Sequence, residues 1–174
     1  LAFENHDHRH CVRDLVAAAE AVCRAQKLRL TPTRRRVLEI LLEEHRALGA
    51  YDVLARLQVE GLGAHPPLAY RALDFLVEHG FAHKLQRLNA FVACADPDAG
   101  AHGAKGRSGE HRPAFLICRK CAAVAEMDAG GVARALAGAA AAAGFRIETA
   151  AVEAEGLCPA CQAAPMGGHG QSCP

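Results

Sequence analysis

The stretch "PPLAYRALDFLVEHGFAHKL", residues 66–85, decides the fold of the first half of the chain. Its prolines favour the start of a helix, Gly80 favours its end, and apolar residues recur between them at spacings of three and four. Tyr70 and Arg71 fall on the opposite, outward face of this helix. The alternation in the overlapping segment "FAHKLQRLNAFVAC" predicts a β-hairpin that turns near residues 87–89.

Two further helices are predicted upstream of this stretch. The segment "LTPTRRRVLEILLEEH" offers Thr31 as an N-cap and Pro32 at the first helical position. The segment "AYDVLARLQVEG" follows and ends at Gly61. Three helices and a hairpin in this order predict a winged helix-turn-helix, whose third helix, expected to start at Pro67, enters the major groove of DNA. The pattern leaves open a small helical bundle with no partner.

The second half of the chain carries two Cys-x-x-Cys motifs. Cys118 and Cys121 lie in "CRKC", Cys158 and Cys161 lie in "CPAC", and 36 residues separate the two pairs. Two such knuckles supply the four thiolates that structural zinc prefers, so a four-cysteine site is predicted. A thioredoxin-like redox site in "CPAC" is the competing interpretation. Against it, we expect no strand-to-helix opening at this motif, and a second pair would be superfluous.

Composition limits the classes of protein that remain. The 174 residues include eight cysteines and ten histidines, and the formal net charge is +1. No apolar run is long enough to span a membrane and no secretion signal is visible, so we expect a cytoplasmic protein whose thiols bind metal. Because the net charge is small, any nucleic-acid binding must depend on the local placement of charges.

The chain is predicted to be α+β, with a winged helix-turn-helix domain followed by a smaller α/β domain. Gly, Ala and Asp enrich the segment between them, which is typical of a linker. The smaller domain is expected to contain a hairpin (114–127), an alanine-rich helix (132–143) that packs against a sheet or a partner chain, and a strand (146–154). The expected boundaries are 1–93 for the first domain, 94–113 for the linker, 114–163 for the second domain and 164–174 for a flexible tail.

A second metal site is suggested by the hairpin registers. If the first hairpin turns at residues 87 and 88, His83 lies opposite Val92 and Cys94 is its diagonal neighbour on the same face. The expected register of the second hairpin places Glu126 opposite Pro113.

That register also puts His111 one diagonal step from Glu126. One thiolate, two imidazoles and one carboxylate suit zinc better than iron or manganese. Because these ligands come from both halves of the chain, a bound metal would fix the angle between the halves. Separate solvated or hydrogen-bonded roles for the four side chains are the alternative.

The sequence resembles the ferric uptake regulator superfamily, and particularly its zinc uptake regulator branch. The resemblance covers about residues 12–163 and rests on "LTPTRRRVLEIL", "AYDVLARL", "PPLAYRALDFLVEHGFAHKL", "CRKC" and "CPAC". It implies a dimeric repressor with no enzymatic activity, whose C-terminal domain mediates dimerisation. Zinc-loaded dimers would bind palindromic AT-rich operators of zinc-uptake genes and release them when zinc falls.

The resemblance also implies two Zn²⁺ ions per chain. It assigns the structural zinc to Cys118, Cys121, Cys158 and Cys161, and the regulatory zinc to His83, Cys94, His111 and Glu126. The iron-sensing branch typically carries a histidine-rich run before the first knuckle, whereas "GEHRPAFLIC" has one histidine, which favours zinc.

DNA contacts are implied for Tyr51, Tyr70 and Arg71. An arginine on the third helix can bind guanine O6 and N7 with two hydrogen bonds. Secondary candidates for phosphate contacts are Arg34, Arg35, Arg36 and Lys84. The family's usual Thr-Val before the tyrosine is replaced here by Leu68-Ala69, which puts one backbone contact in doubt.

Some residues fall outside the resemblance. Cys23 is expected to be a buried small hydrophobe on the first helix. The alternative functions are a family member that senses iron, another metal or peroxide, and, in a different class, a thiol-disulfide oxidoreductase. An accessory metal site is suggested by the histidine-rich ends, with His6, His8, His10 and Cys11 at one end and His169 and Cys173 at the other.

Overall fold

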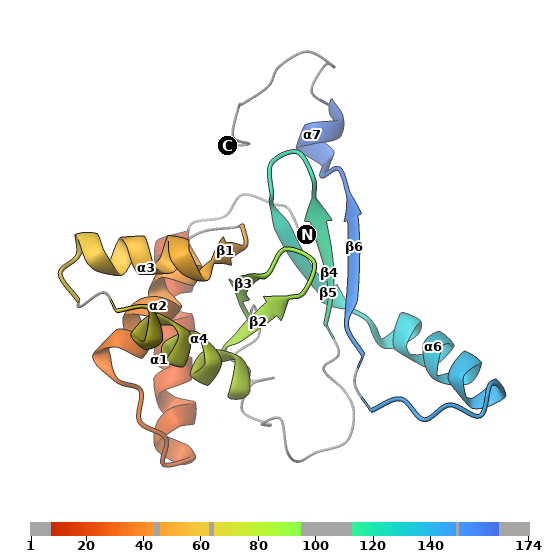
Figure 1. The fold of residues 1–174 in the computed structure, drawn as a ribbon, viewed down its shortest axis with the longest axis horizontal. Coiled ribbons are helices and arrows are strands. Elements are labelled where there is room, and N and C mark those ends of the chain that lie inside the picture. Colours follow the sequence, from red (N-terminus) through yellow and green to blue (C-terminus); the bar gives the residue numbers. More distant parts are fainter. Residues whose placement is uncertain (1–7, 44–45, 63–64, 95–112, 149, 164–174) are drawn as a thin grey trace. The chain divides into compact units, whose positions relative to one another are not determined.

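A computed structural model of the 174-residue chain describes residues 8–43, 46–62, 65–94, 113–148 and 150–163 (Figure 1). The described residues fall into two compact units, one ending at Cys94 and the other beginning at Pro113. The mixture of helices and strands confirms the α+β class. No helix among the described residues is both long and apolar enough to cross a lipid bilayer.

The helices of the first unit begin and end close to the predicted positions. The backbone N–H of Arg34 donates to Thr31 Oγ1 at 3.3 Å, which confirms the predicted N-cap. The third predicted helix starts one residue earlier than expected, at Pro66, and Gly80 follows it in the left-handed conformation (φ 74°). The four helices are α1 (His8–Ala25), α2 (Pro32–Glu43), α3 (Ala50–Val59) and α4 (Pro66–Glu78).

A three-stranded antiparallel sheet completes the first unit. Its strands are β1 (Leu48–Gly49), β2 (Ala82–Leu85) and β3 (Ala90–Ala93), arranged in the order β1-β3-β2. The β2–β3 hairpin is the predicted wing, and its register pairs His83 with Val92 as expected. The sheet rules out an all-helical bundle, so the winged helix-turn-helix is confirmed (Figure 1).

The core of this unit is apolar and nearly free of solvent. Val37 and Ile40 of α2, Leu57 of α3, and Leu73 and Leu76 of α4 are all 0% exposed. These positions carry the three- and four-residue spacing of the sequence pattern, so burial follows directly from the periodicity. Cys23 joins this core at 2% exposure, as expected for a small hydrophobe.

The described part of the second unit contains a three-stranded sheet and two helices. Its elements are β4 (Pro113–Cys118), β5 (Val124–Asp128), α6 (Gly130–Ala142), β6 (Val152–Gly156) and α7 (Pro159–Ala163). The strand order is β5-β4-β6, with β5 antiparallel and β6 parallel to β4. Because β5 runs antiparallel to β4, it returns the chain to the end of the sheet at which β4 begins, and after α6 the chain starts β6 from that end, parallel to β4.

The predicted boundaries in this unit need two corrections. The helix begins at Gly130, two residues before the expected start, and the strand predicted over 146–154 forms only at Val152–Gly156. A strand needs a partner for its backbone hydrogen bonds, and β4 offers residues 114–118 to its parallel neighbour, which residues 152–156 fill. Residues 145–148 alternate between apolar and polar, but they form no strand, and the Phe145 side chain is 66% exposed.

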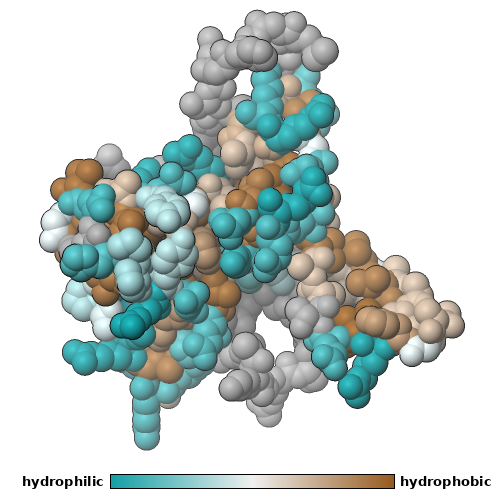
Figure 2. Space-filling model, viewed as in Figure 1, coloured by the Kyte–Doolittle hydropathy of each residue, from teal (hydrophilic) through white to brown (hydrophobic). Residues whose placement is uncertain are grey.

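Helix α6 buries none of its residues within the described part of the chain. Val132 is 49% exposed and Leu136 is 43% exposed, and Figure 2 shows hydrophobic surface over this helix. The helix therefore does not use its apolar side chains to cover its own sheet. Of the two expectations for it, packing against a sheet is wrong for the single chain, and packing against a partner chain stays a prediction.

Candidate metal centre and nucleic-acid interface

The first knuckle is the turn between β4 and β5. Cys118 ends β4, its backbone N–H donates to the carbonyl of Ala123 at 2.9 Å, and the N–H of Ala122 donates back to the carbonyl of Cys118 at 2.9 Å. Ala122 adopts a left-handed conformation with φ 59°. This tight turn brings Cys121 back beside Cys118.

The second knuckle follows β6. The N–H of Arg119 donates to the carbonyl of Gly156 at 3.0 Å, which ties the end of β6 to the first knuckle. Cys158 then precedes the short helix α7, in which Cys161 is buried. A strand-to-helix opening is therefore present at "CPAC", and the expectation that none would be found there is wrong.

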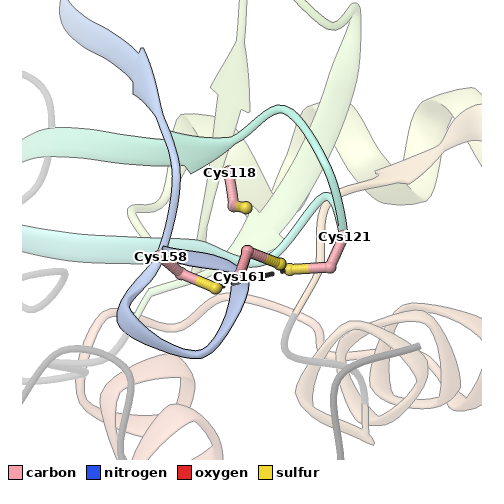
Figure 3. A group of neighbouring side chains, drawn as sticks. All are labelled: Cys118, Cys121, Cys158 and Cys161. Atoms are coloured by element: carbon pink, nitrogen blue, oxygen red, sulfur yellow. Dashed lines mark hydrogen bonds between the residues drawn. The ribbon is translucent and has the colours of Figure 1, made fainter. Parts of the chain in front are cut away.

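The four sulfur atoms converge on one point, although the knuckles are 36 residues apart (Figure 3). Their Sγ atoms all lie within 4.8 Å of one another, and the Sγ atoms of Cys121 and Cys158, on different knuckles, are 3.7 Å apart. Four sulfurs placed about 2.3 Å from a tetrahedral zinc ion are about 3.8 Å from one another. The cluster therefore has the size that a zinc ion requires.

Burial and backbone hydrogen bonds act differently on two of these thiols. Burial raises the pKa of the Cys121 thiol to about 11. Burial also acts to raise the pKa of Cys118, but backbone hydrogen bonds from Cys158, Cys121 and Lys120 outweigh it and lower that pKa to about 6. Since zinc binds thiolates, one ligand is already stabilised as an anion, while binding must displace a proton from another.

The grouping of all four cysteines argues against the redox interpretation. A thioredoxin-like site needs only the pair Cys158 and Cys161, with the second sulfur of the pair as its resolving thiol. Here Cys158 Sγ instead lies 3.7 Å from Cys121 Sγ of the other knuckle. Four convergent thiols fit a tetrahedral metal ion, which uses all of them. A dithiol reaction would use only two of the four.

Two of the residues predicted for the second metal site lie on the wing. His83 is in β2 and faces Val92 across the hairpin, while the N–H of Cys94 donates to the carbonyl of Phe81 at 3.0 Å just beyond β3. One ring nitrogen of His83 and the sulfur of Cys94 lie within 4.8 Å of each other. Cys94 is 4% exposed and borders a small cavity together with Phe81 and residues of α1 and α2.

The predicted register of the second hairpin is wrong by two residues. Glu126 pairs with Phe115, whereas opposite Pro113 lies Asp128. The expected register allowed a two-residue turn between Cys118 and Cys121, but the knuckle extends the turn to Ala123. A shift of two residues keeps Glu126 on the predicted face, because side chains alternate with a period of two. His111 lies outside the described residues.

The predicted DNA-contacting residues are all exposed on the first unit. Tyr51 is the second residue of α3 and is 72% exposed, and Tyr70 on α4 is 42% exposed. Arg71 is exposed beside Tyr70, while Ala69 and Leu73 on the same helix are buried. Helix α4 thus buries one face and presents the side chains that the sequence predicts for a recognition helix.

The arginines at the start of α2 have intramolecular partners that the sequence analysis missed. Both Nε and Nη2 of Arg36 donate to the carboxylate of Glu60 at 2.6 Å, and Nη1 donates to Glu43 at 2.7 Å. Arg35 pairs with Glu20 at 2.7 Å and with Glu39 at 2.9 Å. Two pairs within α2 have a signal in the sequence: Arg35–Glu39, at a spacing of four, and Arg36–Glu39, at a spacing of three and a distance of 3.1 Å.

The side chains predicted for the accessory metal site lie outside the described part of the chain. His6, His169 and Cys173 lie outside the described residues. The backbones of His8, His10 and Cys11 belong to α1, but the structure does not describe their side chains.

These features define a class: a winged-helix protein with a separate α/β unit that holds a four-cysteine metal centre. Comparison with known proteins narrows it. No family model matches the chain. The curated zinc uptake regulation protein of Escherichia coli K12 is 38% identical over 161 residues, which cover 92% of this chain and 89% of that protein.

Solved structures agree with this relative. A zinc uptake regulator complexed with zinc and DNA is 39% identical, with a TM-score of 0.77 and coverage of 87% of this chain and 95% of that one. The holo form of XcZur is 37% identical, with a TM-score of 0.74 and coverage of 87% and 99%. The chain therefore belongs to the zinc uptake regulator family, as the sequence motifs predicted, and is a regulator rather than an enzyme.

Proposed function

We propose that this chain is a zinc-responsive transcriptional repressor that acts in the cytoplasm. A zinc-loaded homodimer binds palindromic AT-rich operators of zinc-uptake genes and releases them when zinc is scarce. The observation that carries this proposal is the presence, in one chain, of an exposed recognition helix and a four-thiolate centre. The likeness to a regulator solved with zinc and DNA supports both parts.

The four-cysteine centre is proposed to hold a structural zinc. Cys118 ends β4, Cys121 lies in the turn before β5, Cys158 follows β6, and Cys161 belongs to α7, so the ligands depend on the fold of this unit. Four protein ligands leave no open coordination position. This zinc would therefore stabilise the fold and take no part in sensing.

Sensing is proposed to depend on a second zinc bound by one thiolate, two imidazoles and one carboxylate. The proximity of a His83 ring nitrogen to Cys94 Sγ supports half of this set. The mixed sulfur, nitrogen and oxygen donors suit zinc better than iron or manganese. The complete proposed set is His83, Cys94, His111 and Glu126.

The proposed regulatory ligands are distributed between the two units. His83 and Cys94 belong to the first unit and Glu126 belongs to the second, with the proposed linker 94–113 between them. Binding of one ion by all of them would restrict the motion of one unit relative to the other. In a dimer, this restriction would set the separation of the two recognition helices at about one turn of DNA.

The dimer is proposed to form through the second unit. Helix α6 leaves Val132 and Leu136 exposed, and such an apolar surface favours contact with another protein surface. A second copy of the chain would cover this helix and bring two winged helices together for a palindromic site.

Native mass spectrometry over a series of buffered free-zinc concentrations tests the metal assignments. We expect one zinc per chain that is retained throughout and a second that titrates. A single permanent zinc would remove the sensing mechanism and leave the structural site. No zinc, together with a Cys158–Cys161 disulfide, would favour the oxidoreductase. A third titrating zinc that is lost when His6, His8 and His10 are replaced by Ala would establish the accessory site.

Selection from a randomised pool of DNA duplexes in zinc-buffered solution tests the repressor assignment. The unsubstituted chain should enrich a palindrome, and a zinc chelator should release it. The variant Cys94→Ser should keep its structural zinc and lose zinc-dependent binding. Cys23→Ala is the matched control, because Cys23 is an equally buried thiol of the same unit that is not a proposed ligand.

The same assay separates the alternatives within the family. Iron or manganese that restores binding where zinc does not would identify a sensor of another metal. Loss of binding after peroxide treatment at constant zinc would identify a peroxide sensor.

A further inference from the structure

The guanidinium group of Arg34 stacks on the recognition helix. Its Cζ atom lies 3.7 Å from the centroid of the Phe75 ring on α4. Phe75 is 7% exposed, so the arginine covers a ring that is almost withdrawn from solvent. A cation over an aromatic face within about 6 Å is attracted by the ring quadrupole, and the attraction is stronger where water is excluded.

Arg34 is also held by hydrogen bonds to the segment that precedes α2. Arg34 Nη1 donates to the backbone carbonyl of Arg29 at 2.7 Å, and the backbone N–H of Arg34 donates to Thr31 Oγ1. The side chain therefore joins the segment before α2 to the C-terminal part of α4. One guanidinium group can stack with its face and donate with its edge at the same time, whereas an ammonium group has no plane to stack.

Phe75 lies one helical turn after Arg71, the proposed DNA contact. The spacing of four residues makes the two side chains neighbours along one row of α4. The Phe75 ring also contacts His79 one turn further on, with ring centroids 4.5 Å apart, and Phe81 at the start of the wing, at 6.4 Å. The row connects α2, the recognition helix and the wing within one unit.

We propose that Arg34 is a positioning residue for sequence-specific DNA binding and is not a phosphate contact. It fixes the rotation of α4 about its own axis through Phe75, and this rotation decides where the Arg71 side chain projects. A functional group must be held within roughly 0.5 Å and 10–20° of its productive geometry. The inference rests on the proposed function, because it assumes that α4 reads DNA.

The guanidinium group of Arg34 contacts different kinds of groups from those of its neighbours. Arg35 and Arg36 are paired with carboxylates, whereas the guanidinium group of Arg34 contacts the Phe75 ring and the carbonyl of Arg29. A positive charge near a recognition helix would ordinarily be assigned to phosphate binding. The two roles make different predictions, because phosphate contacts act on all sequences and base contacts act on one.

The test measures the dissociation constants of the selected palindrome and of a non-cognate duplex of the same length, over a series of salt concentrations. Arg34→Lys retains the charge and removes the planar stack, and Phe75→Leu retains the arginine and removes the ring. Both variants should weaken binding to the palindrome about tenfold and change non-cognate binding less than about twofold, as expected when one base contact is misplaced. The salt dependence should be unchanged.

Two control variants give the largest and the smallest expected changes in specificity. Arg71→Ala removes the proposed base contact itself and sets the largest expected loss of specificity. Arg35→Met removes a charge of α2 that is 52% exposed and should leave the specificity ratio unchanged. Thermal unfolding of each variant shows whether it is folded, and hydrogen exchange of the α4 amides should be faster in Arg34→Lys and Phe75→Leu.

Other outcomes overturn the inference. If Arg34→Met weakens both duplexes alike and lowers the salt slope by about one, Arg34 binds a phosphate. If Phe75→Leu binds the palindrome normally while folded, the stack does not position the helix. If the unsubstituted chain selects no duplex at all, the proposed function fails and the positioning role fails with it; normal selection with normal Arg34→Lys binding refutes the positioning role alone.

Discussion

The two units of this chain are stabilised in different ways. In the first unit, helices α1–α4 and the wing enclose an apolar core in which Val37, Ile40 and Leu73 are fully buried. In the second unit, α6 buries nothing, and a separate cluster is formed by cysteines. The difference indicates that the first unit depends on hydrophobic packing, and it supports the proposal that a bound zinc ion and a partner chain stabilise the second.

This division suits the proposed sensor, in which one unit would read DNA and the other would assemble the dimer. A recognition helix needs a rigid support, which a packed core supplies without any ligand. A small sheet with little core needs a staple, and a four-thiolate zinc is one of the few that a reducing compartment permits. Four experiments test the comparison, from the largest expected effect to the smallest.

Removing a metal ligand should unfold only the second unit. Structural zinc contributes roughly 10–16 kcal/mol to small metal-dependent domains, so Cys118→Ser should abolish the protected core of residues 113–163. Hydrogen exchange measured by mass spectrometry should show fast exchange there and unchanged protection in α2 and α4. Cys23→Ala, which removes a buried thiol from the first unit, should leave the zinc content unchanged. A normal melt for Cys118→Ser would argue against the structural zinc.

Opening a cavity should destabilise only the first unit. Leu73→Ala removes most of a side chain that is 0% exposed, and such changes cost about 2–5 kcal/mol. Chemical unfolding followed by the fluorescence of Tyr70 or Tyr51 should show the loss at any zinc concentration. Leu136→Ala, at a 43% exposed position of α6, should change that transition by less than about 0.5 kcal/mol. Equal losses would mean that the two units unfold together.

Breaking the ion-pair network between α2 and the end of α3 should have a smaller effect. Arg36 is 23% exposed and binds Glu60 with two short hydrogen bonds, so Arg36→Met should cost the first unit about 1 kcal/mol. The hydrogen bonds from Arg36 lower the pKa of Glu60. The stabilisation is therefore present above the ordinary pKa of a glutamate and is lost as the pH falls through the lowered value.

Denaturant unfolding between pH 7 and pH 3 measures this contribution. The difference between Arg36→Met and the unsubstituted chain should shrink as the pH falls. A difference that is constant over this range would mean that the pair contributes through packing alone.

The smallest expected effect is a gain in zinc retention by the second unit. Ala122 adopts φ 59° in the first knuckle, a conformation that costs a residue with a Cβ about 1 kcal/mol or more and costs glycine little. Ala122→Gly should therefore strengthen zinc retention severalfold in competition with a chelator. Ala123→Gly, the neighbouring substitution, should weaken retention or leave it unchanged. A weaker site in Ala122→Gly would show that the knuckle relaxes when zinc binds.

The sequence predicted most of the first unit because its elements obey local rules. Helix α2 has its cap at Thr31, α4 is closed by Gly80, and the wing register follows from where the hairpin turns. The pair of Arg36 with Glu60 could not be predicted, because Glu60 lies 24 residues away, at the C-cap of α3. Nothing in the spacing of the sequence reports a contact of that kind.

The second unit was predicted less accurately for a physical reason. The cysteine motifs identified the ligands, and the four sulfurs do converge. The hairpin register failed by two residues because the knuckle lengthens the turn, and the last strand was drawn too long because its length is set by β4, a partner distant in sequence. The metal site could thus be predicted by residue type, whereas the strands that carry it could not be predicted by local pattern.

The parallel pairing of β4 and β6 has a consequence for how such sites diversify. Cys118 pairs with Gly156, so the second knuckle is delivered to the first by strand register and not by the length of chain between them. Insertions or deletions at the exposed turn after α6, near Gly144, would be absorbed without moving a sulfur atom. Related chains can therefore differ widely in the number of residues between their two cysteine pairs and still build the same tetrahedron, and a search that fixes this number would overlook them.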